Sequence, residues 1–103
     1  MILSDYVNES NIDYINHHLK NIAIINLEKI LHVNYMDIGI EHKKDIKYLT
    51  FQESLRLILT GYYTEPIFEM RLNIYKDDFY LGYYQYLTKL DFTFIDEFFV
   101  ARW

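Results

Sequence analysis

Residues 67–75 alternate between apolar and polar side chains, and this alternation constrains the fold more than any other feature of the chain. The apolar residues occupy the even positions: Phe68, Met70, Leu72 and Ile74. The odd positions between them include Glu69, Arg71 and Asn73. Successive side chains of a strand point to opposite faces of the sheet, so a period of two predicts a half-buried strand. Glu69 is expected on its uncovered face.

A turn and a second strand are predicted next. The sequence YKDD at residues 75–78 indicates a turn, with Asp77 and Asp78 at its tip. The run after the turn carries two alternating sets of side chains. One set is predicted to join the buried face of the first strand: Phe79, Leu81, Tyr83 and Leu87. The other set is predicted to face outward: Tyr80, Gly82, Tyr84 and Tyr86.

A third strand is predicted after a turn at residues 88–90. Its buried face is expected to hold four apolar residues: Phe92, Phe94, Phe98 and Val100. The opposite parity is expected outside: Asp91, Thr93, Ile95, Glu97 and Phe99. Asp96 falls on the predicted buried face, which indicates either a bulge near Asp96 and Glu97 or a different register.

Helical periodicity dominates the first third of the chain. Ser10 with Asp13 resembles a helix N-cap with an acid at the third position. Apolar residues then recur at helical spacing: Ile12, Ile15, Leu19 and Ile22. Residues 22–33 are apolar on nearly every side and also permit a strand, but a helix is favoured because Ala23, Leu27, Ile30 and Leu31 share a face. Residues 34–49 lose the period and predict a loop with a short helical turn.

A second helix is predicted from residue 50. Thr50 and Glu53 form a capping-box pattern, and Gly61 is placed as its stop. Its apolar stripe is expected to comprise Phe51, Leu55, Ile58 and Leu59. The expected fold is therefore α+β, with N-terminal helices (about 10–60) packed on one face of a C-terminal three-stranded antiparallel β-meander (about 67–101). The 103 residues fit a single domain, 1–103.

Composition and charge narrow the classes of function. The net charge of −5 disfavours direct binding to nucleic acid or anionic lipid and suits a basic partner. No cysteine is present, which fits a reducing compartment. The N-terminus lacks the pattern of a secretory signal, and no apolar stretch approaches the length of a membrane span. A cytoplasmic location and no membrane partner are expected.

The residues with catalytic or metal-binding chemistry form no recognisable set. His17 and His18 are adjacent, so on a helix they point about 100° apart and cannot chelate together. The serines lie outside any nucleophile motif, and no glycine-rich phosphate loop is present. The sequence therefore predicts no enzyme activity, metal or cofactor.

Aromatic residues are the main departure in composition, with 11 Tyr and 7 Phe. Tyrosine provides a large, rigid contact area and a hydroxyl at low entropic cost, and it is enriched in binding surfaces. The predicted uncovered face therefore indicates a protein-binding surface. Its expected residues are Glu69, Asp77, Asp78, Tyr80, Tyr84, Tyr86, Asp91 and Glu97. The alternative is that the tyrosines pack against each other, the N-terminal segment or a second copy of the chain.

The segment MRLNIYKDDFYLGYYQYLTKLDFTFIDEFFV resembles the C-terminal half of immunity proteins from bacterial contact-dependent inhibition and polymorphic-toxin systems. The shared features are a strand, an acidic turn, a "GYY"-type strand and a closing "DEFFV"-type strand. The resemblance implies a cytoplasmic antitoxin that binds the toxin domain of its own system and blocks its active site or substrate cleft. Together with the negative charge of the chain, this gives the hypothesis that the cognate toxin is a basic nuclease domain. Two alternatives are a phage-encoded inhibitor of a host defence nuclease, and a homodimeric structural or regulatory domain.

Overall fold

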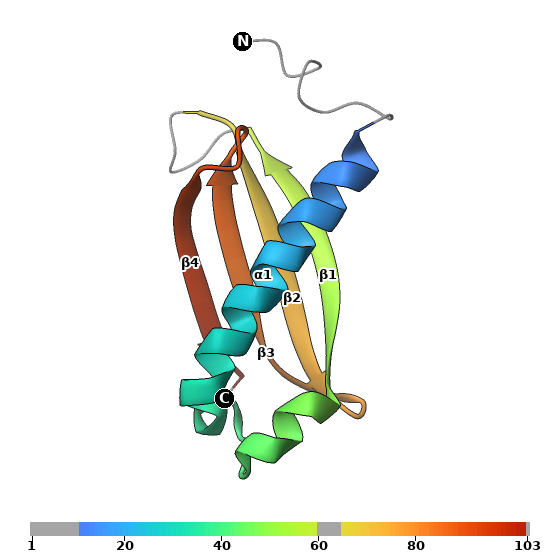
Figure 1. Cartoon of the computed structure of the whole chain (residues 1–103), viewed down its shortest axis with the longest axis vertical. Helices are drawn as coiled ribbons and strands as arrows, with labels where there is room; N and C mark the ends of the chain where they lie inside the picture. The colour runs from blue at the N-terminus through green and yellow to red at the C-terminus, as the bar shows by residue number, and fades with distance from the viewer. Residues whose placement is uncertain (1–10, 60–64, 103) are drawn as a thin grey trace.

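The computed structural model describes residues 11–59 and 65–102, and within them a long helix crosses one face of a four-stranded antiparallel sheet (Figure 1). The strands lie in the order β1-β2-β3-β4. The elements are α1 (Ile12–Asn34), the 3-10 helices η2 (Tyr35–Ile38) and η3 (Lys43–Tyr48), β1 (Leu49–Ile58), β2 (Ile67–Lys76), β3 (Phe79–Lys89) and β4 (Phe94–Ala101). The predicted α+β class is confirmed, but the described sheet has four strands where three were expected.

Helix α1 follows from a stripe of apolar residues spaced four apart. The stripe is buried along its whole length: Ile15, Leu19, Ala23, Leu27 and Leu31. A spacing of four keeps these side chains on one side of a helix, and the stripe packs across the middle strands of the sheet. The prediction that residues 22–33 continue the first helix is confirmed. The expected cap at Ser10 lies outside the described residues.

The segment between α1 and β1 is built from two short 3-10 helices. Gly39 ends η2 in the left-handed region at φ 87°, and its N–H donates to the carbonyl of Met36 over 3.1 Å. Glycine adopts this conformation without a steric cost. Helix η3 then leads directly into β1 (Figure 1). A loop with one short helical turn was expected over residues 34–49; the structure has two 3-10 helices there, between the end of α1 and the start of β1.

The prediction of a second helix at residue 50 was wrong, because residues 49–58 form the edge strand β1. Phe51 and Leu55 are four residues apart, which fits one face of a helix but equally fits one face of a strand. The face of β1 toward α1 also holds Glu53, a polar residue that hides the alternation. The Thr50 to Glu53 pattern is therefore not a capping box.

Glu53 is tolerated on the face of the sheet toward α1 because side chains of α1 pair with its carboxylate. Lys20 Nζ lies 2.6 Å from Glu53 Oε1, and Asn16 Nδ2 donates to Glu53 Oε2 over 2.7 Å. The hydrogen bond from Lys20 is the largest influence on the carboxyl and lowers the pKa of Glu53, against a smaller opposing effect of burial. These contacts fasten the helix to the edge strand.

The Glu53→Gln substitution is expected to cost about 0.5–1 kcal/mol at pH 7, because it removes a partly exposed ion pair. The folded-state pKa of Glu53 is lower than its ordinary value of 4.5, so its contribution is fully present above that value. The contribution is lost as the pH falls through the folded-state pKa. Urea denaturation of both proteins across pH 3 to 7 checks this, and a stability difference that stayed constant on acidification would contradict it.

The face assignment on β3 was correct up to Leu81 and wrong from Gly82 onward, because one extra residue interrupts the ladder between β2 and β3. Tyr75 pairs with Tyr80 and Ile74 pairs with Gly82, which leaves Leu81 without a partner on β2. The extra residue exchanges the two faces beyond it. The side of β3 toward α1 therefore carries Gly82, Tyr84 and Tyr86, and the opposite side carries Tyr83 and Gln85.

A second irregularity has the same effect on β4. Leu87 pairs with Asp96 and Thr88 pairs with Phe94, so Ile95 has no partner on β3. The sequence had indicated a bulge or another register near Asp96, and the bulge lies at Ile95, its neighbour. Beyond it the prediction is reversed: Glu97 and Phe99 face α1, whereas Asp96, Phe98 and Val100 lie on the opposite side.

At Gly82 the backbone of β3 lies close against that of β4. A Cβ atom on Gly82 would overlap the carbonyl oxygen of Val100 and lie 3.0 Å from Cα of Ala101. Its φ of +149° is also one that L-residues rarely adopt. This position therefore requires glycine on two separate grounds.

Candidate protein-binding surface

Helix α1 packs on one face of the sheet, and the described helices leave the opposite, open face uncovered (Figure 1). The side chains of the open face come from alternate positions of all four strands. Near the β2–β3 turn, its rows pair Thr50 with Tyr75 and Tyr80, and Asn73 with Tyr83. The open face is thus most aromatic beside this turn.

Arg71 organises the tyrosines of the open face. Its guanidinium carbon lies 3.8 Å from the ring centroid of Tyr83, a cation–π contact. Its Nε donates to Oδ1 of Asn73 over 2.9 Å, and its Nη2 donates to the hydroxyl of Tyr80 over 3.3 Å. The rings of Tyr80 and Tyr75 are 5.6 Å apart. The three tyrosines are therefore held in place before any partner arrives, which lowers the entropic cost of binding.

The β2–β3 turn lies next to this aromatic area and adds two negatively charged carboxylates to it. Asp77 and Asp78 are both exposed in the turn, and Asp77 has φ 55°, a left-handed conformation that aspartate tolerates better than most residues. The next residue, Phe79, exposes 74% of its surface. We call the combined area the hairpin surface; it comprises Arg71, Tyr75, Asp77, Asp78, Phe79, Tyr80 and Tyr83.

Glu69 lies on the open face as predicted, but it is only 2% exposed. Arg56 Nε donates to its Oε2 over 2.5 Å, and the side-chain amide of Gln85 donates to its other oxygen. These two donors engage both carboxylate oxygens. Glu69 therefore ties three strands together and offers little charge to a partner.

Tyr84, Tyr86 and Glu97 were expected on the uncovered face, and this placement was wrong. Tyr84 is fully buried beneath α1, and its hydroxyl donates to Oε2 of Glu97 over 2.5 Å. Burial is the main cause that raises the pKa of Tyr84, with Glu97 adding to it, and the same two causes raise the pKa of Tyr86. Tyr86 and Glu97 line a groove of about 300 Å³ between α1 and β4.

Asp91 lies in the β3–β4 turn, at the end of the sheet opposite Asp77 and Asp78. Its Oδ1 accepts a hydrogen bond from the backbone N–H of Thr93 over 3.0 Å. Hydrogen bonding by Thr93 lowers the pKa of Asp91. Asp91 therefore stabilises its own turn and does not adjoin the hairpin surface.

Of the predicted contact residues, the structure brings together Asp77, Asp78 and Tyr80. The sequence reasoning missed Phe79 and Tyr83, which it had assigned to the core. Tyr83 was assigned to the wrong face by the assumption of one unbroken alternation along β3. Phe79 precedes the bulge and pairs with Lys76 on the side toward α1, so its side was predicted correctly, but it is 74% exposed and not buried. A signal was available in Gly82, because an isolated glycine in a strand often marks a bulge or a close backbone approach.

Two other kinds of site are absent from the described residues. Across 11–59 and 65–102, no group of three or more His, Cys, Asp or Glu side chains is placed to hold a metal ion. None of the helices in these two ranges has the length and apolar character needed to cross a membrane. Comparison with protein-family models, with curated proteins and with solved structures found no match.

Proposed function

We propose that the chain is a binding protein of the immunity type, which neutralises a basic partner protein by covering it with the hairpin surface. The observation that carries this proposal is a cluster of three tyrosines beside an exposed turn with two carboxylates and Phe79. Arg71 holds Tyr80 and Tyr83, and the ring of Tyr75 contacts that of Tyr80. Rigid aromatic residues of this kind dominate binding energy at protein interfaces. The resemblance of residues 70–100 to immunity proteins supports the same function.

The electrostatics favour a basic partner. The chain has a net charge of −5, and Asp77 and Asp78 project their charges from the end of a hairpin with ten-residue and eleven-residue strands. Such a turn can enter a cleft that normally receives phosphate groups. The carboxylates would accelerate the encounter with a basic nuclease domain, and the aromatic residues would slow its release. The proposed role is therefore inhibition by occupation of the partner's substrate cleft.

The test is capture of the partner by the tagged chain from its native host, followed by mass spectrometry and size-exclusion chromatography of the complex. The proposal expects a stoichiometric basic partner whose nuclease activity falls when the chain is added. The double change Tyr83→Ala with Asp78→Lys should weaken this complex by a factor on the order of a hundred, because it removes an aromatic anchor and reverses a charge.

The matched control is Asp91→Lys, which makes the same charge change in an exposed turn at the other end of the sheet. It should leave the affinity within about threefold, since long-range charge effects are screened by salt. Equal weakening by both variants would contradict the hairpin surface as the contact. Recovery of a self-dimer with no other partner would overturn the inhibitor function and favour a homodimeric domain.

A further inference from the structure

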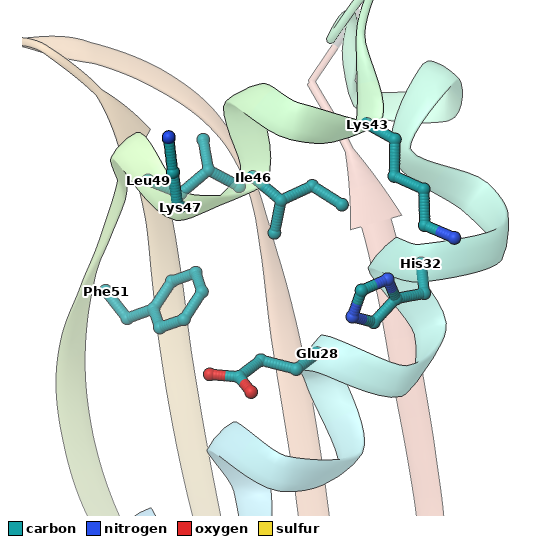
Figure 2. A pocket seen from close by; sticks show the side chains of 7 residues that line it. All are labelled: Glu28, His32, Lys43, Ile46, Lys47, Leu49 and Phe51. Carbon is teal, nitrogen blue, oxygen red and sulfur yellow. The ribbon is translucent and has the colours of Figure 1, made fainter.

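A second feature of the molecule lies apart from the hairpin surface: a pocket of about 360 Å³ between α1, η3 and the start of β1. Ligand sites in proteins typically enclose about 300–1,000 Å³, so this pocket has room for a small organic molecule. Seven residues line it (Figure 2): Glu28, His32, Lys43, Ile46, Lys47, Leu49 and Phe51. None of them belongs to the hairpin surface.

The basic side of the pocket is formed by two residues from separate segments. His32 comes from the last turn of α1, and Lys43 comes from the first residue of η3 and points toward His32 (Figure 2). The third basic residue, Lys47, has its ammonium 5.1 Å from the ring centroid of Tyr48, which does not line the pocket. Two basic groups therefore converge at one end of the pocket, in a chain whose net charge is −5.

Three charged or basic side chains of the pocket form no ion pairs within the described residues: Glu28, His32 and Lys43. This contrasts with Glu53 and Glu69, each of which is paired with a lysine or an arginine. The pocket thus presents Lys43 and His32 at one end and a separate carboxylate, and none of these three side chains is held in an ion pair in the described part of the chain.

The remaining wall of the pocket is apolar. Phe51 lies across the cavity from His32, and Ile46 and Leu49 complete this side (Figure 2). Phe51 is partly buried by contacts with the core, which fixes its position on β1. A flat ring of a ligand can stack on this phenyl group while its polar substituents reach the charged end. Glu28, at the base of the view, can accept a hydrogen bond from the ring.

We propose that this pocket binds a small organic anion with a flat ring. Its carboxylate or phosphate group lies between Lys43 and His32, its ring lies against Phe51, and an amino group attached to the ring donates to Glu28. The combination of an anionic group, a ring and a donor matches the three kinds of lining residue. The inference is independent of the protein partner, because it uses none of the residues of the hairpin surface.

The test uses two probes that share this chemistry and differ in the anionic group: adenosine 5′-monophosphate and 2-aminobenzoate. Binding is followed by amide chemical shifts of the ¹⁵N-labelled chain. The proposal expects at least one probe to bind with a Kd below about 1 mM and to shift signals from residues 28–51. Binding of the nucleotide alone would identify a phosphate ligand, and binding of 2-aminobenzoate alone would identify a carboxylate ligand.

The decisive variants are Lys43→Gln and Lys44→Gln. Both remove one positive charge from neighbouring exposed residues, but only Lys43 lines the pocket. Lys43→Gln should weaken binding about tenfold, as expected for one charged hydrogen bond, and Lys44→Gln should change it by less than about twofold. Phe51→Leu keeps an apolar wall without the ring and should also weaken binding.

Three results would overturn the proposal. The first is that neither probe binds, and the second is that Lys44→Gln weakens binding as much as Lys43→Gln does. The third is that an anion without a ring, such as inorganic phosphate, shifts the same signals as strongly as the two probes do. This result would show that stacking on Phe51 contributes nothing to binding. Amide spectra without a probe establish that each variant is folded.

Discussion

Replacement of Gly82 by alanine is expected to cost about 3–5 kcal/mol of folding free energy, a large part of the roughly 5–15 kcal/mol that stabilises most domains. The added Cβ would overlap the carbonyl oxygen of Val100 and crowd Cα of Ala101. These are backbone atoms of β4, which cannot rotate away as the end of a flexible side chain would. The positive φ adds a separate conformational cost. Urea denaturation followed by circular dichroism measures the loss.

Gly39→Ala is the matched control for this substitution. Gly39 also has a positive φ, of 87°, but a Cβ there would meet nothing within 4 Å. Alanine at this position should therefore cost only about 1–2 kcal/mol, the penalty of the left-handed conformation alone. If the two variants lost equal stability, the close approach of β3 and β4 would not be the cause.

Tyr84→Ala is expected to destabilise the fold by about 3–5 kcal/mol, the range for removal of a large aromatic side chain from a core. Tyr84 exposes none of its surface and fills the space between α1 and β3. The substitution leaves a cavity and also deprives Glu97 of the hydroxyl that donates to it. Thermal and urea unfolding both report this change.

Tyr84→Phe separates the two contributions. It keeps the ring and removes only the hydroxyl, and Glu97 can then be solvated because it lies on an exposed part of β4. The expected cost is about 1 kcal/mol, the net value of one hydrogen bond. A phenylalanine variant as unstable as the alanine variant would show that the hydrogen bond, and not the packing, dominates. Either result makes Tyr84 unsuitable as a probe of partner binding.

The sequence predicted the helix and three of the four strands because each contains a run of apolar residues at helical or alternating spacing that is long enough to identify the element. The failure at β1 arose where one polar residue, Glu53, occupies a position facing the core and obscures the alternation. Its partner Lys20 lies 33 residues away on α1, so no local pattern could reveal the pairing. Tertiary contacts here decide between two periods that the sequence satisfies equally.

The site was harder to predict than the fold because the face of the sheet on which a side chain lies depends on its exact position along the strand. Each strand position was assigned by parity, and parity holds only while the ladder is unbroken. Single unpaired residues at Leu81 and Ile95 reverse it twice. As a result, Tyr80 was placed correctly while Tyr84, four residues later, was not. The exposure of Asp77 and Asp78 was predicted correctly, because these turn residues belong to neither face of the sheet.

Asp96 has a consequence for the outer border of the sheet. β4 is an edge strand with three exposed apolar residues: Phe94, Phe98 and Val100. Free amides on such an edge recruit strands from other molecules and begin aggregation. Asp96 Oδ1 accepts a hydrogen bond from the amide N–H of Glu97 over 2.8 Å and places a charge beside it. An aspartate that seemed misplaced in the sequence thus engages a backbone amide of the edge strand and adds a charge there, two features that oppose the addition of a foreign strand at this point of the edge.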